Sequence, residues 1–165
     1  MLKRLRCDAF APQYRDLSFD RGLNIVLGDD AGSSAIGKTA FLNVIDYVFG
    51  GDAYYTGDIQ RNVGLHTFFF EFEFGNEHLY FYRDTGNTMS VFLCDDQWHY
   101  REEMELAHYR RLLAEKYGCL SGSYGLEDVI SHFFRIYGHG NALEAAPYRS
   151  SIHEDDKKAI DFLMS

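Results

Sequence analysis

Residues 32–39 combine glycine, lysine and threonine at a spacing that binds phosphate. They read Gly-Ser-Ser-Ala-Ile-Gly-Lys-Thr, the P-loop pattern G-x-x-x-x-G-K-[ST]. Glycines let the backbone approach a densely charged triphosphate, and successive N–H groups can form an anion nest around it. We expect Lys38 to reach the β- and γ-phosphates as the catalytic residue, and the Thr39 hydroxyl to bind Mg²⁺. The predicted cofactors are therefore ATP and Mg²⁺.

The predicted contacts to the nucleotide extend slightly beyond the motif. They are Gly28, Gly32, Ser33, Ser34, Ala35, Ile36, Gly37, Lys38, Thr39 and Ala40. Two acidic residues, Asp29 and Asp30, precede the motif and could cap a turn, contact Mg²⁺ through water or simply be solvated.

The flanking sequence supplies the elements that would position this loop. Residues 23–27 are an apolar run that predicts a buried strand, and residues 38–49 predict a helix that ends at Gly50 and Gly51. A strand, a glycine-rich loop, Lys-Thr and a helix in this order are typical of a nucleoside triphosphate site. We therefore predict an α/β P-loop NTPase fold, with residues 1–60 as its core.

Residues 61–101 predict an antiparallel β-arm. Phenylalanines recur at every second position along 68–74, and shorter alternating segments follow at 79–83, 90–94 and 97–100. Tight turns separate these segments, which implies an antiparallel meander rather than a further βαβ unit. We expect the phenylalanine row to be core rather than a stacking platform for bases.

The two ends of the chain add further elements to what we predict to be a single lobe. Alternating residues at 2–10 and 16–20 predict two strands before the P-loop. The last part, 102–165, is predicted to be helical. Its expected helices are 102–117, 126–137 and 155–164.

Composition narrows the functional classes. The chain has 165 residues, 46% of them hydrophobic, and a net charge of −9, so it does not attract a nucleic-acid backbone nonspecifically. No apolar run is long enough to span a membrane, and the basic N-terminus lacks the apolar region of a signal peptide. Three widely spaced cysteines, Cys7, Cys94 and Cys119, form neither a metal pattern nor a disulfide framework. We expect a cytoplasmic protein.

The order of these motifs resembles the N-terminal lobe of SMC-type and RecN/RecF-like ABC ATPase heads. The resemblance is carried by residues 22–28, G-L-N-I-V-L-G, by Gly37-Lys38-Thr39, and by the β-arm that follows. The lengthened loop and the helix end at 45–50, I-D-Y-V-F-G, look most similar to bacterial SMC-like ATPases of ABC-three-component and related defence systems.

This resemblance implies a partial head lobe that binds Mg·ATP and hydrolyses it only when completed. A C-terminal lobe or a partner chain would bring the signature motif, the Walker B acids and a switch histidine, and two heads would enclose the ATP. We therefore expect a truncated lobe, or a split protein completed by another chain. Any association with nucleic acid, in DNA repair or defence, would be indirect, and no membrane is involved.

Two other groups of residues could contact phosphate or metal. Residues 91–96, V-F-L-C-D-D, have the form of a Walker B strand in which Asp95 would hold Mg²⁺ and Asp96 would orient a water. An antiparallel strand that ends in an Asp-Asp turn explains the same residues, and we favour it because tight turns surround this segment. Arg61 could reach a phosphate or be solvated.

Two alternatives to an SMC-like lobe stay open. A small P-loop kinase could use Asp95 or Asp96 as the acid that accepts the substrate's proton, with Arg110 and Arg111 as lid residues. The phenylalanine-rich meander argues against it, since such kinases continue with βαβ units. The third possibility is a non-catalytic interaction module.

Overall fold

The computed structural model describes residues 1–25, 35–56, 64–119, 125–133, 155, 157 and 160. The chain divides into two compact units. The first comprises Met1–Val26 and Tyr55–Leu112, and the second comprises Leu27–Tyr54 and Leu113–Ser165.

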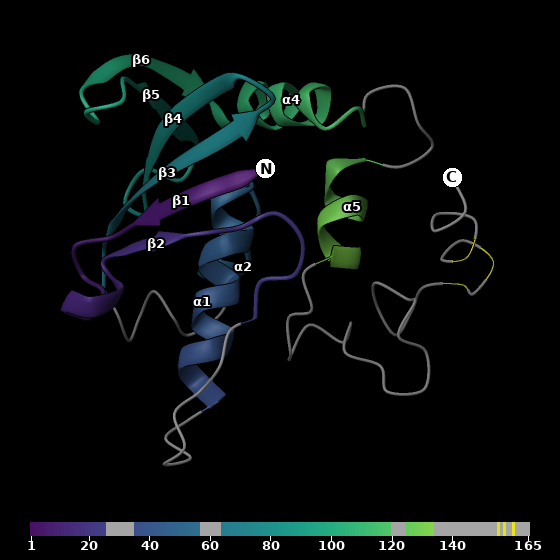
Figure 1. The fold of residues 1–165 in the computed structure, drawn as a ribbon, viewed down its shortest axis with the longest axis horizontal. Coiled ribbons are helices and arrows are strands. Elements are labelled where there is room, and N and C mark those ends of the chain that lie inside the picture. Colours follow the sequence, from purple (N-terminus) through teal and green to yellow (C-terminus); the bar gives the residue numbers. More distant parts are fainter. Residues whose placement is uncertain are drawn as a thin grey trace. The chain divides into compact units, whose positions relative to one another are not determined.

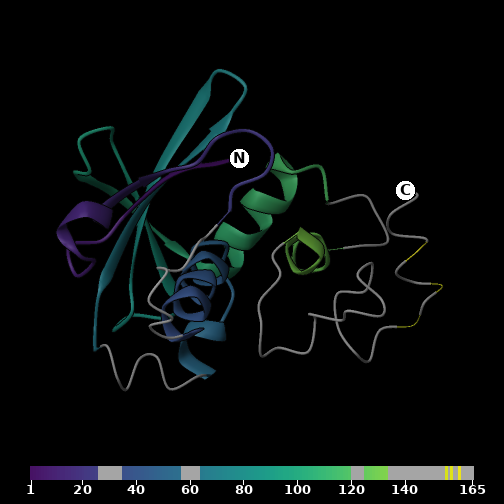
Figure 2. The ribbon, with the colours of Figure 1, turned by 60° about the horizontal axis from the view of Figure 1, so that its bottom comes forward.

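The first unit is built on a six-stranded sheet whose strand order, within the described residues, is β2-β1-β3-β4-β5-β6 (Figure 1). The strands are β1 (Leu2–Arg6), β2 (Asp16–Ser18), β3 (Thr67–Phe74), β4 (Glu77–Asp84), β5 (Ser90–Cys94) and β6 (Tyr100–Glu105). A short 3-10 helix, η1 (Pro12–Tyr14), lies between β1 and β2 in the chain. The hairpin of β3 and β4 forms the centre of the sheet, which Figure 2 shows from a second direction.

One face of the sheet carries the core of this unit. Leu5, Phe70 and Phe81 occupy paired positions on β1, β3 and β4, and all three are fully buried. Tyr109, from the helix that follows β6, lies edge-on to Phe70 and Phe81, with ring centroids 6.3 Å and 5.2 Å away. The phenylalanine row predicted as core is confirmed at positions 68, 70 and 72, which are buried.

The prediction of an α/β P-loop NTPase fold is wrong. All five strand pairs among the described residues are antiparallel, so the described chain is a mostly β fold around one antiparallel sheet. Residues 23–25, predicted to begin a buried strand, belong to no strand, and the side chains of Leu23 and Ile25 are 86% and 68% exposed. Val26 and Leu27 lie outside the described residues.

The antiparallel arrangement has a physical cause in the connections between strands. Gly75 and Asn76 alone join β3 to β4, and Gly75 adopts a φ of +63°, which a glycine tolerates without strain. Parallel neighbours would need a crossover of a dozen residues or more. The short links from β4 to β5 and from β5 to β6 impose the same direction change, as the turn chemistry of this region predicts.

The described helices are α1 (Ala35–Val48), α2 (Ala53–Thr56), α4 (Leu106–Lys116) and α5 (Leu126–Phe133). The prediction of a helix over 102–117 is wrong for its first four residues, which belong to β6. Glu103 and Met104 pair with Phe92 and Val91, so hydrogen bonding to β5 overrides the helix preference of the glutamates. The helix predicted at 126–137 is described only as far as Phe133, and 155–164 lies almost entirely outside the described residues.

Candidate functional site

The helix that follows the glycine-rich segment begins inside the P-loop motif. α1 starts at Ala35, three residues earlier than predicted, so Gly37, Lys38 and Thr39 lie within its first turn and a half. The first four N–H groups of a helix have no intrahelical acceptor, and the helix dipole adds partial positive charge at the same end. The backbone of Ala35 to Lys38 therefore presents donors of the kind that bind phosphate oxygens.

The structure brings together only part of the predicted site. Ala35, Ile36, Gly37, Lys38, Thr39 and Ala40 follow one another along the start of α1. The first five of these are described by their backbone alone, and Ala40 is half-buried. Gly28, Gly32, Ser33 and Ser34 lie outside the described residues, as do Asp29, Asp30 and Arg61.

The other end of α1 is firmly anchored. Gly50 has a φ of +97° and donates its N–H to Tyr47, while the Gly51 N–H donates to the Asp46 carbonyl over 2.8 Å. This pair of bonds is a Schellman cap, which glycine at a left-handed position favours. The Tyr47 ring packs on Tyr54 with centroids 5.6 Å apart. The predicted stop at Gly50 and Gly51 is confirmed, and it fixes the helix whose first turn carries the motif.

The residues that lead toward the motif form a turn held by one amide. Asn24 accepts a hydrogen bond from the Asp20 N–H, and its Nδ2 donates to the carbonyls of Asp20 and Gly22 over 2.8 Å and 3.2 Å. Gly22 has a φ of +92°. Gly22 therefore provides the positive φ of this turn, and Asn24 provides the side-chain hydrogen bonds that hold it.

The Walker B interpretation of residues 91–96 is wrong, and the antiparallel strand with an Asp-Asp turn is confirmed. β5 lies between β4 and β6 and is antiparallel to both. The Asp95 carboxylate accepts the backbone N–H groups of Gln97 and His99 over 3.0 Å and 2.9 Å. Arg101 donates to its other oxygen over 3.0 Å. The hydrogen bond from the His99 N–H, more than any other contact, lowers the pKa of Asp95 and keeps it ionised in the turn.

The face of the sheet opposite the core carries a second cluster, which sequence reasoning missed. We call it the aromatic face. It consists of Phe69, Tyr80, Tyr82, Phe92, Trp98 and Tyr100. The strand register places five of them on the side away from Phe70 and Phe81, and the ring contacts of Trp98 with Phe69 and Tyr80 add it to the same cluster. Five of the six are half-buried, and the Tyr100 side chain is 58% exposed.

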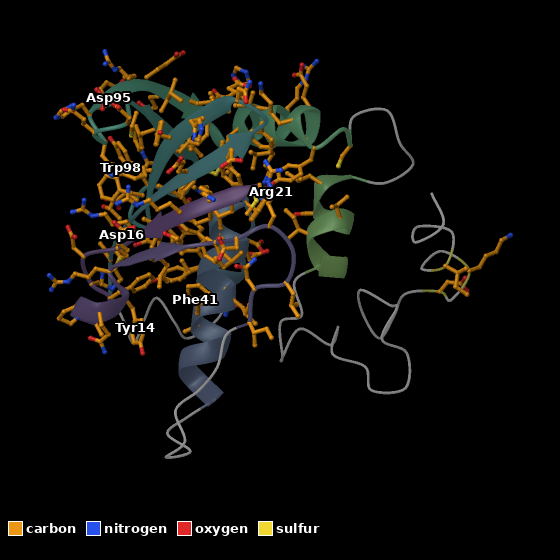
Figure 3. All side chains as sticks on the ribbon, viewed as in Figure 1. Tyr14, Asp16, Arg21, Phe41, Asp95 and Trp98 are labelled. Carbon is orange, nitrogen blue, oxygen red and sulfur yellow. The ribbon has the colours of Figure 1, made fainter. Side chains whose placement is uncertain are left out.

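Trp98 closes one end of the aromatic face. Its ring lies edge-on to Phe69 and Tyr80, with centroids 5.7 Å and 5.6 Å away. The turn capped by Asp95 holds Trp98 at a φ of +67°, a conformation that residues other than glycine rarely adopt. Figure 3 shows Asp16, Trp98 and Asp95 on the same side of the sheet.

A guanidinium is already held against this face. The Arg4 Cζ atom lies 6.0 Å from the centroid of the Trp98 ring, and Arg4 Nε donates to Asp16 Oδ1 over 2.6 Å. The hydrogen bond from Arg4 lowers the pKa of Asp16. An aromatic ring and a carboxylate together hold the cation, which is a favourable arrangement for arginine.

A sequence signal for the aromatic face existed in part. Phe69, Tyr80, Tyr82 and Phe92 alternate with the core residues of three strands, so their common face follows once the strands are paired. Trp98 could not be placed in this way, because its position depends on the left-handed turn.

Comparison with models of protein families, with curated proteins and with solved structures gives no match. Of the helices in the described part of the chain, none has the length and apolar character needed to cross a bilayer.

Proposed function

We propose that this chain binds a nucleoside triphosphate, ATP with Mg²⁺, through residues 32–39. The observation that carries the proposal is the complete G-x-x-x-x-G-K-T motif leading directly into α1, whose backbone is helical from Ala35 onward. Nucleotide binding is proposed for the local segment, residues 32–39, and does not require an α/β sheet.

The residues of the motif fit the proposed ligand chemically. The unpaired N–H groups at the start of α1 suit phosphate oxygens, and Gly37 allows close approach of the backbone. Lys38 would supply a positive charge to the β- and γ-phosphates. The Thr39 hydroxyl is an oxygen ligand of the kind that Mg²⁺ accepts, and the ion would neutralise charge on the phosphates.

We further propose that a second chain or lobe completes the site for hydrolysis. The exposed Leu23 and Ile25 support this, because two apolar side chains that precede the motif in the sequence are left uncovered in the described structure. The Asp95 carboxylate is committed to the hydrogen bonds of its own turn, so we assign it no catalytic role. The resemblance to SMC-like heads, in which a second lobe completes the ATP site, stays a prediction.

The three cysteines are all free, which supports a reducing cytoplasmic location.

The test is titration calorimetry with Mg·ATP on the full chain, with Lys38→Ala measured in parallel. Lys157→Ala is the matched control, since Lys157 is an exposed lysine away from the motif in sequence. We expect saturable binding by the wild type and the control, a loss of at least tenfold in Lys38→Ala, and no phosphate release by the chain alone. Absence of binding, or equal binding by Lys38→Ala, would overturn the proposal.

A further inference from the structure

The β6 end of the aromatic face combines stacked rings with a carboxylate. Tyr82 and Phe92 stack at 4.6 Å with an angle of 13° between their planes, and Tyr100 lies 6.2 Å from Phe92. Glu103 pairs directly with Phe92 across β5 and β6, so the two side chains share this face. Both Tyr100 and Glu103 are exposed, which leaves the group open to a ligand.

Glu103 is available for a cation. Its Oε1 accepts a hydrogen bond from the Ser90 hydroxyl over 2.7 Å, and it forms no ion pair with any residue that the structure describes. Burial, more than any other cause, raises the pKa of the Tyr82 phenol, and Glu103 makes the smallest of the contributions from titratable neighbours.

The same face shows how it binds a cation at its opposite end. There the Arg4 guanidinium lies over Trp98 and bonds to Asp16. Phe92, Tyr100 and Glu103 repeat that combination of aromatic rings and a carboxylate. β6 is an edge strand among the described residues, so a partner can approach from its free side. The net charge of −9 favours a basic partner over a nucleic acid.

We propose that the aromatic face docks an arginine-bearing segment of a partner protein, with one guanidinium over Phe92 and Tyr100 and bonded to Glu103. Cation–π contact and a charge-assisted hydrogen bond together give such a site its preference for arginine. The proposal is independent of nucleotide binding, because it uses residues of the sheet alone.

The experiment uses the full chain and a nine-residue peptide of alternating arginine and serine, measured by calorimetry. The same peptide with citrulline in place of arginine tests the charge at nearly constant shape. Glu103→Gln and Tyr100→Ala remove parts of the site. Glu102→Gln is the matched control, because Glu102 is exposed on the same strand and pairs with Leu93 on the other face.

We expect the arginine peptide to bind, the citrulline peptide to bind at least tenfold more weakly, and Glu103→Gln and Tyr100→Ala each to weaken binding about five- to tenfold. Glu102→Gln should change affinity less than twofold. Equal effects of Glu102→Gln and Glu103→Gln, or no binding at millimolar peptide, would overturn the proposal. So would tighter binding of oligothymidylate, or self-association of the chain that Glu103→Gln abolishes, since these would assign the face to nucleic acid or to a second copy.

Discussion

Two adjacent phenylalanines on β3 should differ sharply in their contribution to stability. Phe70 is fully buried, with the rings of Phe72, Phe81 and Tyr109 between 5.9 Å and 6.3 Å away. Replacing such a side chain with alanine loses its transfer free energy and leaves a cavity, which together cost about 3–5 kcal/mol. Phe70→Ala should therefore lower the folded-to-unfolded ratio by roughly two to four orders of magnitude.

Phe69 points to the opposite face and is only half-buried. It loses two ring contacts on truncation, with Tyr82 at 5.5 Å and Trp98 at 5.7 Å. Each such contact contributes about 0.5–1.5 kcal/mol beyond the burial of its area. Because the half-buried Phe69 has less burial to lose than Phe70 and leaves no enclosed cavity, Phe69→Ala should cost clearly less than Phe70→Ala, about 1–3 kcal/mol. The two variants change the same side chain in the same strand, and they differ only in the face from which it is removed.

Urea unfolding measures this difference. Trp98 is the single tryptophan and lies in the sheet unit, so its fluorescence reports on this unit specifically. We expect the midpoint of Phe70→Ala to fall well below that of Phe69→Ala. An equal loss, or a larger loss from Phe69→Ala, would mean that β3 is shifted by one residue, because such a shift exchanges the two faces.

Three further predictions follow from individual contacts. Asp16→Asn should destabilise the chain by about 1 kcal/mol or less at pH 7. Because Arg4 lowers the folded pKa of Asp16 below 3.8, this difference should disappear as the pH falls through that folded pKa, and a difference that stays constant to pH 2 would contradict the ion pair. Gly50→Ala should lower the thermal midpoint of unfolding measured by circular dichroism, because a φ of +97° costs a residue with a Cβ about 1–2 kcal/mol. An unchanged midpoint would contradict the left-handed cap at Gly50. Burial raises the pKa of Cys94 to about 11, so at pH 8 the half-exposed Cys119 should react first with a thiol reagent, and fast labelling of Cys94 in the folded chain would be inconsistent with its burial.

Local patterns in the sequence predicted those elements whose structure depends on neighbouring residues. The period-two row in β3 and the turn at Gly75 and Asn76 define a hairpin without knowledge of the rest of the chain. The Schellman cap at Gly50 and the turn at Asp95 are equally local, because each satisfies its hydrogen bonds within five residues.

The incorrect predictions concern pairing between distant segments. An apolar run such as residues 23–27 indicates a strand that requires a partner, but it does not say whether the chain provides one. Leu23 and Ile25 are exposed because no described strand pairs with them. Glu102 to Glu105 have a helical composition, and only the ladder to β5 makes them a strand. The P-loop motif likewise predicts local chemistry, whereas the type of sheet that the chain forms depends on pairing between distant segments.

The most direct test of nucleotide binding maps the binding site residue by residue. Amide signals of the ¹⁵N-labelled chain would be followed by NMR during titration with Mg·ATP. We expect saturable shifts at residues 32–39, with Gly37, Lys38 and Thr39 among the largest, and little change along β3 and β4. Shifts confined to the sheet, or no shifts at millimolar nucleotide, would contradict nucleotide binding at this motif.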